Sequence, residues 1–409
     1  MKIAYFSPLP PERSGIADYS ALLLPALEER IDVSVVRRGA KRPPRGADAA
    51  LYHIGNNPEA HGWIFDALRR RRGVVVLHDF VLHHLVAGLT LGRGDPDGYL
   101  DAMQRDAGVV GRLLAHGVVD NLLPPIWEQR AEDFPLVGEV LASADSVICH
   151  SSYIERLARE YGYDGPIAVI PMPAWPAVEL GDRLAPADRS PLIGCFGYLN
   201  AAKRVPQLLE AFEHVRQSFP DALLVLAGAA AADVRIDVDR LGDGVLRLAH
   251  QDERSLWQLL ADCDICVALR WPTMGETSGM AIRALSLGTP LVVSDVGWFS
   301  ELPDDVAAKV PVGDGEVEML AAVLERLAAD TELRDRMGAA ASQYARTEHG
   351  LARVADLYVV ALEEGAGWPR VRDSVLRDVA EAAHDVGMTM NDPELSDVAD
   401  RAREVGLGR

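Results

Sequence analysis

The chain has 409 residues, of which 49% are hydrophobic and 25% are charged, proportions typical of a folded globular protein. This composition excludes a disordered tail protein, a collagen and a small disulfide-stapled scaffold. The formal net charge is −20, which disfavours a general nucleic-acid binder because such a protein needs a basic face to neutralise phosphates. At about 150 residues per domain, the length predicts two or three domains.

In the first half, short β-branched runs alternate with longer amphipathic stretches. Strands are predicted at residues 2–6, 31–36, 49–53, 74–77, 146–150 and 167–170. Helices are predicted at residues 16–30 and 152–161, with a long and mostly helical segment from about 80 to 142. Residues 74–77 are only Val and Leu, which is typical of a strand buried on both faces of a parallel sheet. The alternation predicts a doubly wound α/β domain over residues 1–173.

A proline-rich linker, residues 174–190, separates this domain from a second alternation. Strands are predicted at residues 192–196, 222–226, 245–248, 265–269 and 290–294, and helices at 205–218, 254–261, 279–287 and 316–329. These elements predict a second Rossmann-like domain over residues 191–350. We expect the two domains to face a central cleft, because open α/β sheets place ligands beyond their strand ends. Residues 351–409 are predicted to be helical, with the first helix crossing back to the N-terminal domain.

The four cysteines indicate a reducing compartment rather than a disulfide framework. Cys263 and Cys266 form a C-x-x-C pair, but no second pair stands at the spacing of a zinc site. Their segment, ADCDICVAL, is typical of a buried strand. We therefore interpret them as packing residues, with redox or metal chemistry as the alternative.

The sequence shows neither a signal peptide nor a membrane-spanning run. Its first residues, MKIAYFSPLPP, give only a short apolar stretch, and the longest apolar tract, residues 74–91, is interrupted by His and Asp. We expect a soluble, cytoplasmic protein. Two basic runs, at residues 37–45 and 69–72, are typical of solvated surface. The alternative is a peripheral contact with anionic lipid at the inner face of the membrane, or with an anionic acceptor.

The segment GETSGMAIRALSLGTPLVVSDVG, residues 275–297, predicts a turn, a helix, a Gly-Thr-Pro break and a buried strand. Thr277 or Ser278 is a natural N-cap, and the free N–H groups of such a helix start attract anions together with the helix dipole. Gly279 lets a ligand approach the backbone, and Glu276 could accept hydrogen bonds from sugar hydroxyls. The alternative is an ordinary capped helix.

A second motif, GCFGYLNAAKRVPQLLEAF at residues 194–212, places Lys203 between a strand and a helix. Lysine is scarce in this chain, and a compact ammonium beyond a strand end suits a diphosphate. In a third motif, SPLPPERSGIADYS at residues 7–20, Gly15 opens the first helix, where βα units bind phosphates or sugars. Neither G-x-G-x-x-G nor a P-loop is present, which disfavours a dinucleotide site and a P-loop ATPase.

A fourth motif, VVVLHDF at residues 74–80, places His78 and Asp79 at the end of a buried strand. A histidine there could donate to a substrate oxygen while the aspartate orients it. His53 and Asn56 follow another strand in the same way. The alternative is that these histidines are structural or solvated.

Together these motifs resemble the family 4 retaining glycosyltransferases of GT-B architecture over residues 1–362. The most specific stretch is GETSGMAIRALSLGTPLVVSDVGWFSELP, supported by FGYLNAAKR. The resemblance implies a nucleotide-sugar donor of UDP or GDP type in the C-terminal domain. It implies a glycan, lipid-linked or small-molecule acceptor in the N-terminal domain, and no cofactor.

The resemblance also implies roles for single residues. Lys203 would pair with the diphosphate, Glu276 would hold the donor sugar, and His78 would contact that sugar near the reacting carbon. The other donor-side candidates are Gly15, Arg204, Arg270, Thr277, Ser278, Gly279, Met280, Arg283 and Glu301. The acceptor-side candidates are Asp18, His53, Asn56 and Asp79.

The sequence departs from the family pattern at two places. The family has a second glutamate that contacts the ribose, whereas this chain has Ala284 or Arg283 there, depending on the alignment. The family also has an arginine where this chain has Tyr198. We expect Arg204 or Arg270 to replace that cation.

We expect a metal-independent transfer that retains the anomeric configuration. The D-x-D matches are interpreted as structural; they are Asp95/Asp97, Asp237/Asp239 and Asp262/Asp264. Asp18, His78 and Asp79 are bases by type, but the resemblance assigns the histidine to the donor sugar. The alternatives are a sugar-nucleotide epimerase on the same fold and a non-catalytic nucleotide-sugar-binding protein.

Overall fold

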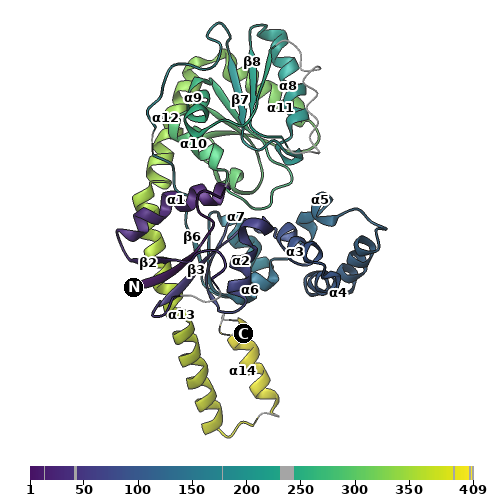
Figure 1. Cartoon of the computed structure of the whole chain (residues 1–409), viewed down its shortest axis with the longest axis vertical. Helices are drawn as coiled ribbons and strands as arrows, with labels where there is room; N and C mark the ends of the chain where they lie inside the picture. Colours follow the sequence, from purple (N-terminus) through teal and green to yellow (C-terminus); the bar gives the residue numbers. More distant parts are fainter. Residues whose placement is uncertain are drawn as a thin grey trace. The chain divides into compact units, whose positions relative to one another are not determined.

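The computed structural model describes residues 1–12, 14–40, 44–176, 178–230, 244–389, 392–404 and 407. The chain divides into two compact units (Figure 1). The first unit comprises Met1–Pro171, Met274–Glu276 and Val354–Arg409, and the second comprises Met172–Thr273 and Thr277–Arg353. Each unit is built around its own parallel sheet, so the two Rossmann-like domains predicted from the sequence are confirmed.

The first sheet has six parallel strands in the order β2-β1-β3-β4-β5-β6. They are β1 (Lys2–Phe6), β2 (Asp32–Val35), β3 (Ala49–Ile54), β4 (Gly73–Leu77), β5 (Ala144–Cys149) and β6 (Ile167–Val169). The central strands β3 and β4 are buried throughout, as expected for a sheet covered on both faces. Apolar residues of α2 (Pro58–Leu68), α6 (Gly138–Ser143) and α7 (Ser152–Glu160) join its core on one face.

Two helices that are distant in sequence contact each other in this unit. They are α1 (Gly15–Glu28) and the long α13 (Leu351–Asp385), which is followed by α14 (Pro393–Glu404). The hydroxyls of Tyr19 on α1 and Tyr358 on α13 are hydrogen-bonded, and both side chains are fully buried. In the described residues, no helix is long and apolar enough to cross a membrane.

The segment predicted to be mostly helical is a set of short helices around one kinked helix. These are α3 (His83–Leu89), η1 (Leu91–Arg93), α4 (Pro96–Val119), α5 (Ile126–Gln129) and η2 (Ala131–Asp133). The backbone of α4 is non-helical at Ala107 and Gly108, where Gly108 has a positive φ of 62°. This segment packs around a separate apolar cluster that includes Tyr99, Met103 and Phe134. It therefore forms a subdomain beside the sheet rather than one of its layers.

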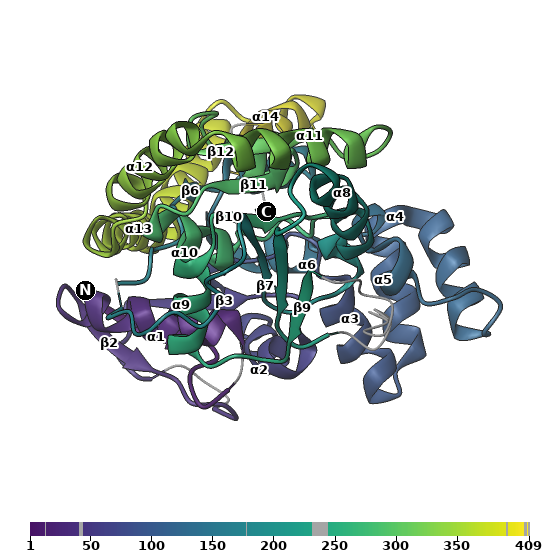
Figure 2. The same ribbon diagram turned by 90° about the horizontal axis from the view of Figure 1, so that it is seen from above.

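The second sheet also has six parallel strands, in the order β12-β11-β10-β7-β8-β9. They are β7 (Leu192–Phe196), β8 (Leu223–Ala227), β9 (Val245–Leu248), β10 (Ile265–Ala268), β11 (Leu291–Ser294) and β12 (Ala307–Val310). Figure 2 shows β10 and β7 side by side at the centre of this sheet. Cys263 and Cys266 are buried and free of disulfides, and burial raises the pKa of both thiols, which supports a packing role.

Helices cover both faces of the second sheet. α8 (Val205–Ser218) and α11 (Glu316–Ala329) pack together on one face, while α9 (Glu253–Asp262), α10 (Gly279–Leu287) and α12 (Thr331–Glu348) lie on the other (Figure 1). Two short 3₁₀ turns, η3 (Ala201–Lys203) and η5 (Gly297–Glu301), follow β7 and β11. The loops of the motifs at residues 194–212 and 275–297 therefore lie at the carboxyl ends of β7, β10 and β11, where open α/β sheets bind ligands.

Candidate functional site

The start of α10 has unpaired helix donors of the kind that attract anions. The side chain of Ser278 caps the helix by accepting a hydrogen bond from the N–H of Ala281 at 3.2 Å. The N–H groups of Gly279 and Met280 point outward from the first turn, since no residue of the helix precedes them as a partner. The hydroxyl oxygen of Thr277 is buried and has no hydrogen-bond partner among the described residues. Unused donors thus gather at the positive end of the helix dipole.

Lys203 lies next to this helix start. Its side chain is only 7% exposed, and its ammonium donates a hydrogen bond to the carbonyl of Phe196. A Cβ placed on Gly197 would lie 3.2 Å from Lys203 Nζ and 3.4 Å from the side chain of Met280. The ammonium and the first turn of α10 therefore meet at the same glycine. A diphosphate held there would face a buried positive charge and free N–H groups.

The two cations that could replace the missing arginine have different surroundings. Arg204 donates from Nε and Nη2 to the carboxylate of Glu316, which is almost fully buried at the start of α11. Arg270 follows β10. Burial raises the pKa of the Cys195 thiol, and the positive charges of Lys203 and Arg270 oppose that rise, so both cations lie near one thiol. The structure pairs Arg204 with Glu316 and places Arg270 near Lys203, and which of the two arginines serves as the second cation stays a prediction.

Glu276 is held by the first unit, which the sequence alone did not indicate. The carbonyl of Met274 accepts hydrogen bonds from the N–H groups of Phe80 at 2.7 Å and Val81 at 3.0 Å. Gly275 has a φ of +89°, and a Cβ there would lie 2.9 Å from the Cβ of Phe80, so only glycine fits. Oε2 of Glu276 accepts a hydrogen bond from the N–H of Met274 at 2.8 Å. The carboxylate is thereby fixed beside the backbone that follows His78 and Asp79.

His78 belongs to a buried cluster of histidines at the ends of β3, β4 and β5. Its Nε2 lies 3.0 Å from Nδ1 of His53, which is completely buried. Nδ1 of His61 donates to the carbonyl of His53 at 3.0 Å, and Nδ1 of His150 donates to the carbonyl of Ile170 at 2.8 Å. Burial lowers the pKa of His53 and His78 well below the usual value and that of His61 to about 4. These three rings are therefore neutral at pH 7.

The structure gives the predicted acceptor-side residues different surroundings. His53 is buried behind His78, so the direct acceptor contact predicted for it does not fit, and it is placed to support His78 instead. The N–H of Asn56 donates to Asp79 Oδ2 at 2.8 Å, and Asn56 Oδ1 accepts from the N–H of Leu85 at 3.1 Å. Asn56 and Asp79 therefore tie together the loops that follow β3 and β4.

The start of α1 leaves room for a ligand. Ser14 caps this helix by accepting from the N–H of Ala17 at 3.0 Å. A Cβ placed on Gly15 would meet nothing within 4 Å, and Asp18 is exposed in the first turn. Glu301, which ends η5 of the second unit, is also exposed. The roles of Gly15, Asp18 and Glu301 stay predictions.

Residues 180–344 match the family described as glycosyl transferases group 1. A curated relative, D-inositol 3-phosphate glycosyltransferase of Streptomyces bingchenggensis, is 26% identical over 272 residues, which are 58% of this chain and 57% of the relative. An uncharacterized glycosyltransferase of Bacillus subtilis is 29% identical over 40% of this chain and 45% of its own length. The chain thus spans about half the length of the curated relatives it matches.

Apart from Met274–Glu276, the region that matches this family lies in the second of the two Rossmann-like units, and solved structures show the fold of the whole arrangement. Sucrose-phosphate synthase of Thermosynechococcus elongatus has a TM-score of 0.57 at 18% identity, covering 91% of this chain and 100% of its own. The Anabaena protein Alr3699/HepE, in complex with UDP and glucose, has a TM-score of 0.55 at 17% identity, covering 89% and 100%. At these identities the likeness concerns the fold, and it confirms the GT-B architecture predicted from the sequence.

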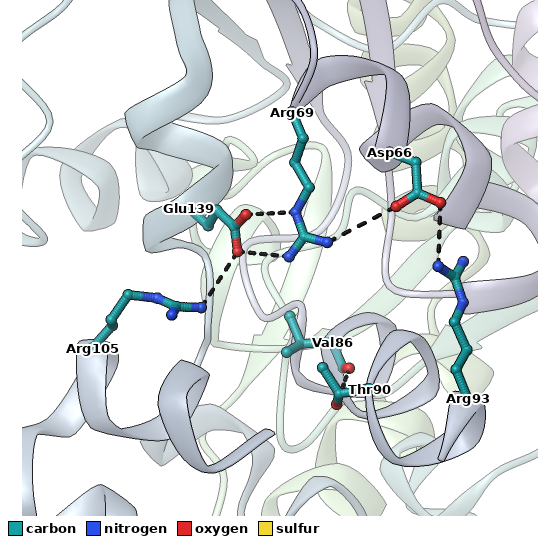
Figure 3. A network of polar contacts seen from close by, with 7 residues as sticks. All are labelled: Asp66, Arg69, Val86, Thr90, Arg93, Arg105 and Glu139. Atoms are coloured by element: carbon teal, nitrogen blue, oxygen red, sulfur yellow. Dashed lines mark hydrogen bonds and ion pairs between the residues drawn. The ribbon is translucent and has the colours of Figure 1, made fainter. Parts of the chain in front are cut away.

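Arg69, the first residue of the basic run at residues 69–72, belongs to an ion-pair network of the first unit (Figure 3). Arg69 makes two bonds to Glu139, at 2.5 and 2.8 Å, and Arg105 contacts the same carboxylate at 3.5 Å. Arg93 pairs with Asp66 at 3.2 Å. Within the run, Arg72 also pairs with Asp145 at 2.9 Å, so Arg69 and Arg72 are held by neighbouring carboxylates, and the peripheral contact stays a prediction. In the other basic run, residues 41–43 lie outside the described residues, as does the Asp237/Asp239 match.

No group of three or more His, Cys, Asp or Glu side chains is arranged to hold a metal ion in the described part of the chain. The residues that the sequence singled out form two sets. Lys203, Arg270 and the start of α10 gather in the second unit, and His78, Asp79 and Glu276 gather in the first. Sequence reasoning missed Glu253 and Trp175, which surround Arg283; the only signal was an acidic helix start and a tryptophan in the linker.

Proposed function

We propose that the protein is a glycosyltransferase that moves a sugar from a nucleotide-diphosphate sugar to an acceptor hydroxyl. The observation that carries the proposal is the meeting of Lys203 and the start of α10 at Gly197, within the region that matches the glycosyl transferases group 1 family. A diphosphate leaving group develops negative charge as the glycosidic bond breaks. A buried ammonium, a nearby guanidinium from Arg270 and a helix N-terminus are donors suited to that charge without a metal ion.

On the sugar side, we assign binding to Glu276 and His78. Glu276 is followed directly by Thr277, so the carboxylate stands one residue from the phosphate-binding segment. One of its oxygens accepts a hydrogen bond from the N–H of Met274, which fixes the carboxylate, and a carboxylate can accept several hydrogen bonds at once, including those of sugar hydroxyls. A neutral His78 can exchange a hydrogen bond with a sugar oxygen without placing a charge beside the reacting carbon.

We further propose that the transfer retains the anomeric configuration. Double displacement would need a nucleophilic carboxylate under the anomeric carbon, and Glu276 is fixed by its own backbone instead. In same-face transfer, the acceptor oxygen bonds to the anomeric carbon as the bond to the phosphate oxygen breaks. That phosphate oxygen takes the acceptor proton, so no protein base is required.

The helical subdomain of the first unit is the proposed acceptor-binding region. Its kinked helix and the following loop expose five large apolar side chains, which are Val109, Val110, Leu113, Leu122 and Leu123. This region could bind a glycan, a lipid-linked acceptor or a small-molecule acceptor. Exchanging residues 80–130 for those of a relative should change acceptor preference and leave donor preference unaltered. A change in donor preference instead would mean that the two units have the opposite roles.

The direct experiment is a thermal-shift panel of UDP, GDP, ADP and dTDP sugars with the wild type and Lys203→Ala. A ligand at 100 times its Kd stabilises by about 2.7 kcal/mol, and the variant should lose this gain. Sugar transfer in the presence of EDTA is expected to match transfer with added Mg²⁺. Conversion of the sugar nucleotide into an epimeric sugar nucleotide without any acceptor would indicate the epimerase, and binding without turnover would indicate the non-catalytic protein.

A further inference from the structure

The carboxylate of Glu253 is held rigidly at one oxygen and open at the other. Glu253 is the first residue of α9. Its Oε1 accepts hydrogen bonds from Trp257 Nε1 at 2.8 Å and from Arg283 Nη2 and Nε at 3.1 and 3.2 Å. Among the described residues, Oε2 is contacted by Arg283 Nη2 alone, at 3.4 Å. The side chain is 52% exposed, so Oε2 faces solvent with unused lone pairs.

Arg283 connects this carboxylate to the start of α10. Its side chain is only 8% exposed, and its guanidinium lies over the ring of Trp175, 3.8 Å from the centroid. Nη1 donates to the carbonyl of Gly279 at 3.3 Å. A Cβ on Gly279 would lie 3.2 Å from Trp175 and 3.4 Å from Arg283 Nη1. Gly279 thus anchors Arg283, and Arg283 in turn presents Glu253, so the carboxylate has a fixed position beside the proposed phosphate site.

We propose that Glu253 binds the 2′ and 3′ hydroxyls of the donor ribose, with Arg283 and Trp175 as positioning residues. This inference rests on the proposed function, because it needs the diphosphate at the start of α10. A carboxylate accepts two hydrogen bonds from a vicinal diol, and a ribose follows the diphosphate directly along a nucleotide. In one of the two alignments with the family, residue 283 is the arginine that stands at the position of the ribose-binding glutamate, and this arginine pairs with a carboxylate from the neighbouring helix.

A competing explanation is that Glu253 only neutralises Arg283 and fixes α10. The two explanations predict different losses of affinity when Glu253 is substituted, depending on which groups the ligand carries. A carboxylate that binds the diol affects ligands with both hydroxyls. A carboxylate that only fixes α10 affects every ligand with a diphosphate, since the phosphate-binding N–H groups move with the helix.

The test is calorimetric titration of the full chain with UDP, with 2′,3′-dideoxy-UDP and with inorganic pyrophosphate. Glu253→Gln should weaken UDP about tenfold to a hundredfold, the range for losing charge-assisted hydrogen bonds. Its affinities for the dideoxy nucleotide and for pyrophosphate should stay at the wild-type values. Arg283→Lys should give the same pattern, because lysine cannot hold both carboxylate oxygens in one plane. GDP and its dideoxy analogue replace the uridine pair if the donor panel selects GDP.

Two controls separate this inference from the proposed function. Lys203→Ala should weaken all three ligands, and its failure to do so would overturn the diphosphate site itself. Glu332→Gln, a change of the same kind at an exposed position of α12, should leave all three affinities unaltered. Unaltered UDP binding by Glu253→Gln, or an equal loss for UDP, dideoxy-UDP and pyrophosphate, would overturn the ribose assignment. A Tm within a degree or two of wild type establishes that the variant is folded, and Glu253→Asp serves as the second variant.

Discussion

His53 Nδ1 lies 3.0 Å from His78 Nε2, and the two rings are stacked at an interplanar angle of 25°. Since both rings are neutral at pH 7, one nitrogen must donate and the other accept. Nε2 of His53 is buried and has no hydrogen-bond partner among the described residues. Burying an unpaired ring nitrogen that carries no proton costs less free energy than burying an unpaired N–H. This favours a proton on His53 Nδ1, which then fixes the other proton of the pair on His78 Nδ1. His78 would thereby present an N–H to its ligand.

Replacing His53 should therefore reduce turnover without weakening nucleotide binding. We expect His53→Gln to lower kcat roughly tenfold, the cost of about one hydrogen bond, while the Kd for UDP stays unchanged. Nitrogen-15 NMR of the wild type should show His78 protonated at Nδ1. An unchanged kcat, or His78 protonated at Nε2, would contradict the support role of His53.

Removing the ammonium of Lys203 should affect the chemical step most. A fixed cation on the leaving diphosphate acts mainly in the transition state, and one such contact is worth roughly 10²–10³ in rate. Lys203→Ala is therefore expected to lose that factor in kcat. Lys309→Ala removes another lysine of the same unit, which pairs with Asp304, and it should keep wild-type turnover. Near-wild-type turnover in Lys203→Ala would contradict the assignment of the diphosphate site.

Substitution of Arg204 and of Arg270, the two candidates for the second cation, should affect different properties of the protein. Arg204→Ala leaves the buried Glu316 without its partner, which should cost about 3–5 kcal/mol of stability. Arg270→Ala removes the guanidinium near Lys203 and should weaken donor binding. Melting curves with and without UDP measure both effects on the same samples. A large loss of UDP affinity in Arg204→Ala at temperatures where it is folded would reverse the assignment.

The buried histidines make the first unit sensitive to acid. In the unfolded chain they bind protons below pH 6.5, whereas burial keeps His53, His61 and His78 neutral in the folded state. Stability is therefore complete above pH 6.5 and falls as the pH drops toward 4, by up to about 1.4 kcal/mol per pH unit for each histidine. Urea unfolding at several pH values measures this slope. His84→Gln, which removes a more exposed ring, should show the wild-type slope, and a flat profile in the wild type would contradict the prediction.

The sequence predicted the fold well because buried parallel strands are nearly pure Val, Leu and Ile runs. It missed β12, whose residues Ala307–Val310 are short and include a lysine. It also could not place Met274–Glu276 in the first unit, since that depends on two hydrogen bonds to residues almost 200 positions earlier.

The side chains of the site were likewise predictable where they depend on local sequence and not where they depend on a distant partner. Lys203 and Ser278 were found from local motifs, because a strand end and a helix start are local features. Arg204 was grouped with the donor residues because its partner, Glu316, lies 112 residues away. Glu253 escaped notice for the same reason, since only the fold brings it to Arg283. Local chemistry was readable from the sequence, whereas pairings between distant residues were not.

The anomeric configuration of the first-formed product tests most directly whether the protein transfers a sugar from a nucleotide sugar with retention of that configuration. Proton NMR in the first minutes follows the sugar from an α-linked donor to the acceptor, or to water where hydrolysis competes, before mutarotation mixes the anomers. We expect an α-configured product, formed roughly 10²–10³ times more slowly by Lys203→Ala. A β-configured first product would contradict the same-face mechanism and the family 4 resemblance together.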